Sequence, residues 1–405
     1  MGKPVYMDNA ATTRVSDEAL AAMLPHFTES YGNPSALYDL GQDAFRAVED
    51  ARASVAASLG ALKSEIFFTS GGTESDNWAV ASAAESLGGR GRHVIASAAE
   101  HNAVLRPLQR LEGKGFEVTL LPVDREGRVS PEALDSAIRP DTILVSIIAA
   151  SNVVGTVQDV KRLAAVCRGR KVLFHTDAVQ AAGHVPVDVR DWDVDLLSVS
   201  AHKFHGPKGA GALFSRIPRL PAPLILGGGQ EKGGRSGTEN VPGAAGLAAA
   251  LAAAVRDMPR DSARLSAMRD RIIAGALRIP GVVLTGDPAR RLPGHASFVV
   301  EGIRHSAHLI NMLNGLGICA SSGSACSASS READHVLRAL GYGWEPFASL
   351  RISLSPYNTD GEADYLLERL PGCVEALRRR DPHSSRFRGA AGGAPGARGR
   401  DGAAG

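Results

Sequence analysis

The chain has few cysteines, and they are scattered. Four occur in 405 residues, and no two have the C-x-x-C spacing of a zinc site: Cys167, Cys319, Cys326 and Cys373. Four are too few for the disulfide framework of a secreted protein. The first residues, MGKPVYMDNAATT, also lack the basic and apolar pattern of a leader. We therefore expect a protein of the reducing cytoplasm.

Long apolar runs and an excess of positive charge are missing as well. The longest stretch of low polarity, residues 243–255, falls well short of the ~20 residues that span a bilayer. The net charge is +2, and the segment after residue 384 holds four arginines against one aspartate, so the body of the chain has no basic bias. These absences give no case for a membrane or nucleic-acid partner.

What the chain does contain is an alternation of strands and helices. Strands are expected near residues 93–98, 116–123, 142–150, 171–176, 194–200 and 210–215, with helices near 102–112, 131–139 and 159–168. Helices are also expected over 16–30 and 42–59, and two separate ones over 241–257 and 261–278. The alternation predicts an α/β fold with a mostly parallel, seven-stranded type of sheet covered by helices on both faces.

The length of the chain exceeds what a single core usually holds, so we expect two domains. Residues 16–257 would form the large domain. Residues 1–15 and 258–383 would form a smaller α+β domain, in which strands near 281–285, 296–301 and 349–355 alternate with helices. The tail, residues 384–405, is rich in Gly, Ala and Arg and is expected to be disordered.

Residues 194–211, VDLLSVSAHKFHGPKGAG, carry a lysine to the end of an apolar run. Ligands of doubly wound sheets bind beyond the carboxyl ends of the strands, so Lys203 is expected to point into a site. Its amine could form a Schiff base with a carbonyl cofactor. A lysine chosen at random is more often a solvated loop residue. The neighbouring strand ends must decide between these interpretations.

Polar residues follow the other predicted strands. His101 follows one strand, Asn152 another, and Asp177 and Gln180 a third, while Gly72 and Thr73 begin a helix directly after a short strand at 66–68. Singly, each has an ordinary explanation as a cap, a turn residue or a surface group. Together they supply a carboxylate, a flat imidazole, a helix start suited to phosphate and an amine, which are the four partners that pyridoxal phosphate needs.

A second reactive residue lies far along the chain, in GICASSGSACSASS. Cys326 is surrounded by Ser and Gly, so its thiol is expected to be accessible, whereas Cys167 and Cys373 lie on apolar helix faces and are expected to be buried. Arg351, in SLRISLS, could bind a carboxylate or could be an exposed strand residue.

With these residues, the chain resembles the cysteine desulfurases of the NifS/IscS type, in the class V aminotransferase superfamily. The resemblance runs from about Tyr6 to about Leu370. Its motifs, in order, are DNAATT, GNPS, FTSGGTESDN, EHNAV, HTDAVQ, SAHKFHGPKG, GGGQEKGGRSGTEN and SSGSAC. It implies a fold type I enzyme that binds pyridoxal 5'-phosphate, acts as a homodimer, takes sulfur from L-cysteine and leaves L-alanine.

By motif position the resemblance also implies residue roles. Lys203 would bind the cofactor aldehyde, Asp177 would pair with the ring nitrogen, and His101 would stack on the ring and relay a proton. The other cofactor contacts would be Gly72, Thr73, Asn152, Gln180, Ser200, His202 and, from the other subunit, Thr238. Asn33 and Arg351 would bind the substrate carboxylate, and Cys326 would accept the sulfur as a persulfide. The form SSGSAC is similar to the subgroup that serves iron–sulfur scaffolds, so such a scaffold or another sulfur acceptor is the expected protein partner.

The chain departs from the family pattern at three places. Val153 stands where a glutamate is common, Tyr38 stands where a histidine usually follows GNPS, and the Gly and Arg tail replaces the C-terminal end used for scaffold docking. None of these is a residue assigned to bond making. The reaction class is therefore expected to be kept.

Three alternatives remain open at this point. A selenocysteine lyase or an aminotransferase of the same superfamily would share the cofactor residues, but transamination needs no thiol at position 326. A non-catalytic sulfur carrier would not need Lys203, Asp177 and His101 together. A metal site on His202 and His205 lacks a third ligand with suitable spacing, so no metal is expected.

Overall fold

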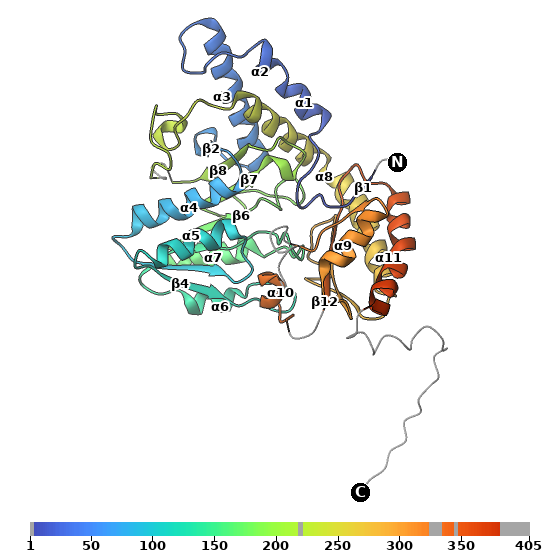
Figure 1. Cartoon of the computed structure of the whole chain (residues 1–405). Helices are drawn as coiled ribbons and strands as arrows, with labels where there is room; N and C mark the ends of the chain where they lie inside the picture. Colours follow the sequence, from blue (N-terminus) through green and yellow to red (C-terminus); the bar gives the residue numbers. More distant parts are fainter. Residues whose placement is uncertain (1–3, 218–221, 324–333, 344–346, 381–405) are drawn as a thin grey trace.

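The structure is a computed structural model, and it describes residues 4–217, 222–323, 334–343 and 347–380. Figure 1 shows two lobes, a larger one that holds most of the first half of the chain and a smaller one that holds the N-terminal strand and the last helix. Cys326 and the tail predicted at 384–405 lie outside the described residues.

The large lobe is organised around one sheet. Its strands are β2 (Ile66–Thr69), β3 (His93–Ser97), β4 (Glu117–Leu121), β5 (Thr142–Ser146), β6 (Leu173–Asp177), β7 (Leu196–Ser200) and β8 (Gly211–Ser215). They are ordered β2-β8-β7-β6-β5-β3-β4. β8 is antiparallel to both neighbours and every other pair is parallel. The predicted α/β fold with a mostly parallel seven-stranded sheet is confirmed, and the carboxyl ends of β3, β5, β6 and β7 meet at one edge.

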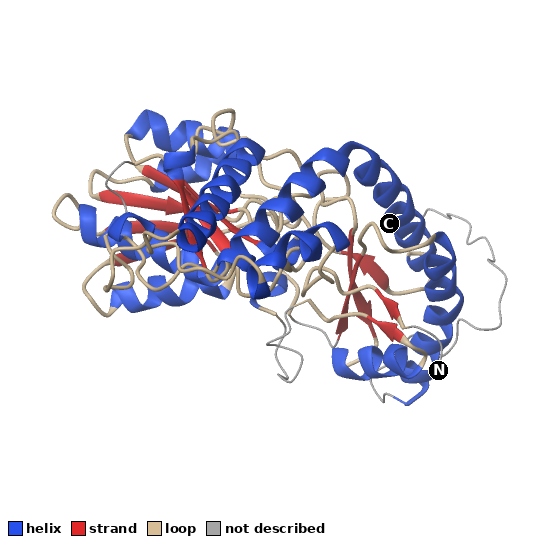
Figure 2. Ribbon diagram, turned by 90° about the horizontal axis from the view of Figure 1, so that it is seen from above, coloured by secondary structure: helices blue, strands red, loops and turns tan. Residues whose placement is uncertain are grey.

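Helices cover both faces of this sheet (Figure 2). They are α3 (Asp39–Leu59), α4 (Gly72–Leu87), α5 (Asn102–Glu112), α6 (Pro131–Ala137), α7 (Val160–Arg170) and α8 (Val241–Ala276). Two shorter helices, α1 (Asp17–Met23) and α2 (Pro25–Thr28), pack against α8. Successive strand residues point to opposite faces. Val94 of β3 therefore packs with Val80 of α4 and Val104 of α5, while its neighbour Ile95 joins the cluster on the other face.

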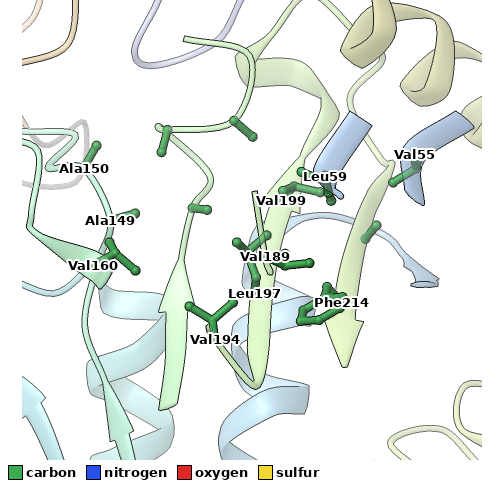
Figure 3. Packing of buried hydrophobic residues seen from close by; sticks show 14 of the residues in the cluster. Val55, Leu59, Ala149, Ala150, Val160, Val189, Val194, Leu197, Val199 and Phe214 are labelled. Atoms are coloured by element: carbon green, nitrogen blue, oxygen red, sulfur yellow. The ribbon is translucent and has the colours of Figure 1, made fainter. Parts of the chain in front are cut away.

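The main cluster of buried side chains fills the space between the sheet and α3, α7 and α8. Figure 3 shows Leu197 and Val199 of β7 with Val55 and Leu59 of α3 and with Phe214 of β8. All five are at most 1% exposed. β7 is buried on both faces, as a central strand of a covered parallel sheet must be, so the turn that follows it starts from a fixed position.

The small lobe has its own sheets and core. Its elements are β1 (Val5–Tyr6), β9 (Val282–Leu284), β10 (His295–Glu301), β11 (Ile318–Cys319), β12 (Phe347–Ser353), α9 (Ser306–Gly315), α10 (His335–Ala339) and α11 (Asp360–Arg380). β10 lies between β9 and β12 and is antiparallel to both, and β1 pairs in parallel with β11. Phe298 of β10, Leu350 of β12 and Leu366 of α11 belong to a second buried cluster, which is separate from the core of the large lobe.

The expectation of two helices over 241–257 and 261–278 is wrong, because α8 is one helix that continues through Pro259. Proline removes one backbone hydrogen bond and crowds the preceding turn, which favours a break. Burial of the two halves in different cores outweighs that cost: Leu247 and Leu251 pack in the large lobe, and Leu265 and Ile272 in the small one. Conversely, the helix expected over 16–30 is divided into α1 and α2, which begins at Pro25.

α8 is the one described helix that is long and apolar enough to cross a membrane by length and composition, and half of its most apolar window is buried in the protein. Core helices of soluble proteins have the same property. The division of the chain at residue 257 falls inside α8, between the residues that pack in the two cores, and it remains a proposal.

Candidate active site

A cavity of about 250 Å³ lies at the edge of the large sheet where the parallel strands end. Its walls are formed by Gly72, Thr73, Asp76, His101, Ile148, Asn152, Asp177, Val179, Gln180, Ser200, His202 and Lys203. Every residue predicted to contact the cofactor is among them except Thr238. The structure thus brings together side chains that are separated by more than a hundred positions in the sequence.

Lys203 ends a short 3-10 turn, Ala201–Lys203, that follows β7 directly. Its Nζ donates to two backbone carbonyls of the N-terminal segment, Ala10 O at 2.6 Å and Ala11 O at 2.9 Å. Burial, aided by the positive charge of Arg351, lowers the pKa of the Lys203 amine to about 8. A larger fraction of the amine is then neutral and nucleophilic near neutral pH than for an exposed lysine.

Three buried carboxyl groups lie in or behind this cavity. Asp177 ends β6, is 4% exposed and accepts a hydrogen bond from Val179 N at 2.9 Å. Burial raises its pKa, and it also raises the pKa of Asp76 on α4 and brings that of Glu100 to about 8. Within the described parts of the chain, Oδ1 of Asp76 has no hydrogen-bond partner, although His175 Nε2 lies 3.6 Å from it. A buried carboxyl group with a raised pKa is stabilised in its ionised form by a cationic group beside it.

His101 is the N-cap of α5, and its orientation follows from that position. Nδ1 accepts a hydrogen bond from Ala103 N at 3.1 Å. The ring proton of the neutral form is therefore on Nε2. Burial is the largest effect on the His101 pKa and lowers it, with Lys203 contributing in the same direction. The cavity is thus lined by a neutral imidazole whose Nε2 can donate.

The turn between β2 and α4 forms another wall. Gly71 has a φ of 153°, and α4 begins at Gly72. A Cβ added to Gly72 would lie 2.5 Å from Cγ2 of Val179, so a side chain would not fit. The first turn of α4 consequently presents backbone N–H groups and the positive end of the helix dipole to the cavity, with Thr73 and Ser200 beside them. This is the usual construction of a phosphate site.

These observations fit pyridoxal 5'-phosphate, which the sequence resemblance implies. An amine is available for its aldehyde, a buried carboxyl for its ring nitrogen, a neutral imidazole for its ring face and a helix start for its phosphate. The raised pKa values of the buried Asp177 and Asp76 agree with a site that is completed by a cationic ring.

Arg351 reaches the site from β12 of the small lobe. It is 2% exposed, pairs with Asp8 at 2.7 Å, and donates to Asn152 O at 2.8 Å and to Gly323 O. It does not line the cavity, but its charge acts on Lys203. The prediction left open whether it lies on an exposed strand, and the structure shows that it is buried between the lobes.

Two predicted residues lie elsewhere in the single chain. Asn33 is exposed between α2 and α3, and its side chain accepts a hydrogen bond from Ser35 N at 2.9 Å. Thr238 is exposed in the glycine-rich loop and lines a separate cavity of about 240 Å³. The structure therefore brings neither side chain to the Lys203 cavity within one subunit.

Sequence reasoning missed several parts of the site. Asp76 follows Gly72 by four positions, so the helical repeat itself puts both on one face of α4. Asp8, Ala10 and Ala11 belong to the DNAATT motif, but backbone carbonyls carry no signal in a side-chain pattern. His335, at the start of α10, was also missed, and its Nε2 lies 2.8 Å from Glu100 O, one residue before His101.

The departure at Val153 has a structural explanation, because the side chain is 2% exposed and packs with Val336 and Leu337 of α10. A glutamate there would be buried among apolar groups. Tyr38 precedes α3 and is 62% exposed, and nothing in the described structure explains it.

Comparison with known proteins supports the same interpretation. The model of the class-V aminotransferase family matches residues 5–366. A protein named cysteine desulfurase IscS from Methanosarcina thermophila is 48% identical over 381 residues, which are 94% of each chain. A solved NifS-like protein is 40% identical, with a TM-score of 0.87, and the match covers 92% of this chain and all of that one. A structure described as SspA in complex with cysteine is 35% identical, with a TM-score of 0.77, and covers 88% and 100%.

Proposed function

Because the chain belongs to the cysteine desulfurases of the class-V aminotransferase family, we propose that Lys203 and Cys326 divide the reaction between them. The protein is a pyridoxal phosphate-dependent cysteine desulfurase. The substrate is L-cysteine, the carbon product is L-alanine, and the sulfur remains on Cys326 for transfer. The observation that carries the assignment of residues is the convergence of Lys203, Asp177 and His101 on one cavity.

Pyridoxal phosphate, when bound, supplies an electron sink for the bonds at the substrate α-carbon. Lys203 would hold the aldehyde of this group through Nζ, and Asp177 would keep its ring nitrogen cationic. The first turn of α4, with Gly72, Thr73, Ser200 and His202, would bind its phosphate. Gln180 and Asn152 would contact its ring.

Proton transfer is assigned to Lys203 and His101, two groups of the cavity whose pKa values burial lowers. Lys203 Nζ, with a pKa of about 8, takes the proton from the substrate α-carbon. His101 can donate a hydrogen bond to the substrate sulfur through Nε2, which carries the ring proton because Nδ1 accepts from Ala103 N. Arg351 binds the substrate carboxylate, and its contact with Asp8 holds the guanidinium group in position until then. Asn33, the other residue expected at the carboxylate, is exposed and outside the cavity in the single chain.

Cys326 acts on sulfur. Its thiolate attacks the sulfur of the bound cysteine, a sulfur–sulfur bond forms, and the bond between sulfur and the β-carbon breaks. That carbon takes up a proton and becomes the methyl group of alanine. Two thiols thus become one persulfide while one carbon is reduced, so no external oxidant is needed.

We further infer a homodimer, in which Thr238 completes the phosphate site of the other subunit. Large apolar side chains are exposed along α1 to α3, among them Leu24, Phe27 and Leu37, and Leu226 is exposed near Thr238. Exposed apolar groups gathered on one region indicate an interface. The loop that carries Thr238 is held firmly, because Glu231 forms a buried double hydrogen bond with Arg52.

Hybrid dimers test this arrangement. A hybrid of one Lys203→Ala subunit with one Thr238→Ala subunit should contain one complete site, because the Thr238→Ala subunit keeps its lysine and borrows the intact threonine. A hybrid of one wild-type subunit with a subunit carrying both substitutions should contain none. The first hybrid should thus show about half of the wild-type turnover, whereas the reverse order of activities would place Thr238 in its own subunit's site.

We propose that the persulfide is passed to an acceptor protein in the cytoplasm, which is an iron–sulfur scaffold or another sulfur acceptor.

Substitution of Cys326 tests the persulfide chemistry itself. Cys326→Ser should keep the visible absorbance of the bound cofactor but lose formation of alanine from L-cysteine. Cys319→Ser, which changes a half-buried cysteine in β11, is the matched control and should keep both. Unchanged turnover in Cys326→Ser would exclude the persulfide mechanism.

A further inference from the structure

The guanidinium group of Arg351 is closed in by its partners. Only 2% of the side chain is exposed. Nη1 donates to two backbone carbonyls, Asn152 O at 2.8 Å and Gly323 O, and Nη2 donates to Oδ1 of Asp8 at 2.7 Å. Nε has no hydrogen-bond partner among the described residues, and it is buried as well. In the described structure, the arginine therefore has no open N–H group for a further anion.

The proposed function nevertheless requires a carboxylate to reach this arginine from the Lys203 cavity. Arg351 lies directly behind the cavity wall, because one carbonyl that it binds belongs to Asn152, which lines the cavity. On the other side, Asp8 is two residues from Ala10, whose carbonyl accepts a hydrogen bond from Lys203 Nζ. A substrate at Lys203 would thus lie near Arg351, but one present partner of the arginine must first move away.

Asp8 is the partner that can leave. The carbonyls of Asn152 and Gly323 belong to the backbone, so they cannot turn away unless the chain around them moves. The carboxylate of Asp8 is carried by a side chain that is 21% exposed, so water can receive its charge. The backbone of Asp8 is fixed, since its carbonyl accepts from Ala11 N at 3.1 Å and from the Tyr6 hydroxyl at 3.1 Å. A change of side-chain rotamer alone would free the arginine.

From these contacts, and resting on the role of Arg351 in the proposed function, we propose that Asp8 competes with the substrate carboxylate for Arg351. Both groups are carboxylates that form a charge-assisted hydrogen bond with the same guanidinium group. Asp8 is part of the chain, so it competes at a high effective concentration. Only the fraction of the enzyme in which Asp8 has turned away can bind the substrate carboxylate, and the apparent affinity is reduced by that fraction. Asp8 is thus a positioning residue that sets substrate affinity through Arg351.

Competition and simple support predict effects of opposite sign. If Asp8 only held Arg351 in place, its removal would weaken the binding of the substrate. If Asp8 competes, its removal strengthens that binding. A ligand without a carboxylate should show neither effect, because it does not need the arginine.

L-Alanine, the carbon product, and L-alaninamide distinguish these cases. They share the amine and the methyl group, but a neutral amide replaces the carboxylate in L-alaninamide. Each is titrated into the holoenzyme, and the change in the visible absorbance of the bound cofactor gives its Kd. Asp8→Asn keeps the size of the side chain and removes its charge. In this variant the Kd of L-alanine should fall about fivefold or more, whereas that of L-alaninamide should change by less than about twofold.

Asp193→Asn is the matched control. Asp193 also pairs with a guanidinium group, that of Arg168 at 3.1 Å, but it precedes β7, at the end of the strand remote from Lys203. This variant should leave both Kd values unchanged. If Asp8→Asn fails to fold, Asp8→Ser removes the carboxylate with a smaller side chain and should have the same effect. Arg351→Gln should raise the Kd of L-alanine towards that of L-alaninamide.

Tighter binding of L-alanine alone in Asp8→Asn would support the competition. Weaker binding would mean that Asp8 only supports Arg351, and an unchanged Kd would mean that the carboxylate reaches the arginine with Asp8 in place. Equal changes for both ligands would mean that Asp8 acts on the amine. Each of these three results would overturn the competition, and the role of Arg351 would stand if Arg351→Gln weakens the binding of L-alanine. An unchanged Kd of L-alanine in Arg351→Gln would instead refute that role, and the competition with it.

Discussion

The two sides of the Lys203 site are built in different ways. On the large-lobe side, each important side chain lies at the end of a different strand: His101 follows β3, Asp177 ends β6 and Lys203 follows β7. On the small-lobe side, Arg351 lies within β12 and is held by Asp8, a carbonyl of the large lobe and Gly323. A single sheet therefore fixes the cofactor side, whereas the substrate side depends on how the two lobes meet.

The N-terminal segment joins the two sides. Asn9 donates to Ser353 O at 2.9 Å in the small lobe, while Thr13 N donates to His202 O at 3.0 Å in the large one. Between them, Ala10 O accepts from Lys203 Nζ. A short piece of backbone thus sets the distance between the lysine and the arginine, and the DNAATT motif has this structural role in addition to any chemical one.

The largest effect is expected on the cofactor side. Asp177→Asn keeps the size of the side chain but removes the charge that holds the ring nitrogen cationic. Turnover of L-cysteine should fall about 100- to 1000-fold, as when one charge-stabilising group is removed from an active site. The measurement is kcat from alanine formation, with cofactor absorbance recorded in parallel to show that the cofactor is still bound.

Asp195→Asn is the matched control for that variant. Asp195 is also buried, at 4% exposure, and bonds to Phe174 N at 2.9 Å and Arg168 at 2.8 Å, but it lies near the opposite end of the neighbouring strand. The Asp195→Asn variant should have a lower melting temperature than the wild type but the same kcat. Equal losses of kcat in the two variants would mean that Asp177 acts through stability alone.

The difference between the two sides also explains what the sequence could predict. Strand ends are visible as apolar runs followed by polar residues, so His101, Asp177 and Lys203 could be assigned to one edge before the structure was known. Arg351 could not be assigned in this way, because an arginine inside a strand has no partner that the local pattern reveals. Its partner Asp8 lies more than three hundred residues away and meets it only through the pairing of β1 with the small lobe.

Helix boundaries show the same limit. The start of α5 could be predicted, because His101 caps the helix through a contact with Ala103 that is local in the sequence. The continuity of α8 through Pro259 could not be foreseen, because local propensity favours a break, and the two cores that hold its halves are tertiary features. Thr238 could not be placed from one chain either, because its proposed role is in the site of another subunit.

A smaller effect is expected on the substrate side. Arg351→Gln removes a charged donor for the substrate carboxylate, and the KM for L-cysteine should rise about 10- to 100-fold, which is the worth of a charge-assisted hydrogen bond. The cofactor should remain bound, because Arg351 does not line its cavity. Loss of cofactor absorbance in this variant would show that the two sides are not independent.

The smallest effect is expected on the pKa of Lys203, where the substrate side acts on the cofactor side. Burial lowers the pKa of Lys203 to about 8, and the charge of Arg351 is the second cause. A neighbouring cation disfavours the ammonium form, so its removal in Arg351→Gln should raise the pKa and shift capture of added pyridoxal phosphate by the cofactor-free protein to higher pH. The rate of appearance of the visible absorbance, measured from pH 6 to 10, gives the midpoint pH of cofactor capture.

Arg264→Gln is the control, and it changes an arginine that is bonded to Asn358 O at 2.8 Å and is remote from the cavity. This variant should leave the midpoint pH unchanged. A midpoint that stays near 8 in Arg351→Gln would assign the low pKa to burial alone, and the lysine would then belong wholly to the large-lobe side.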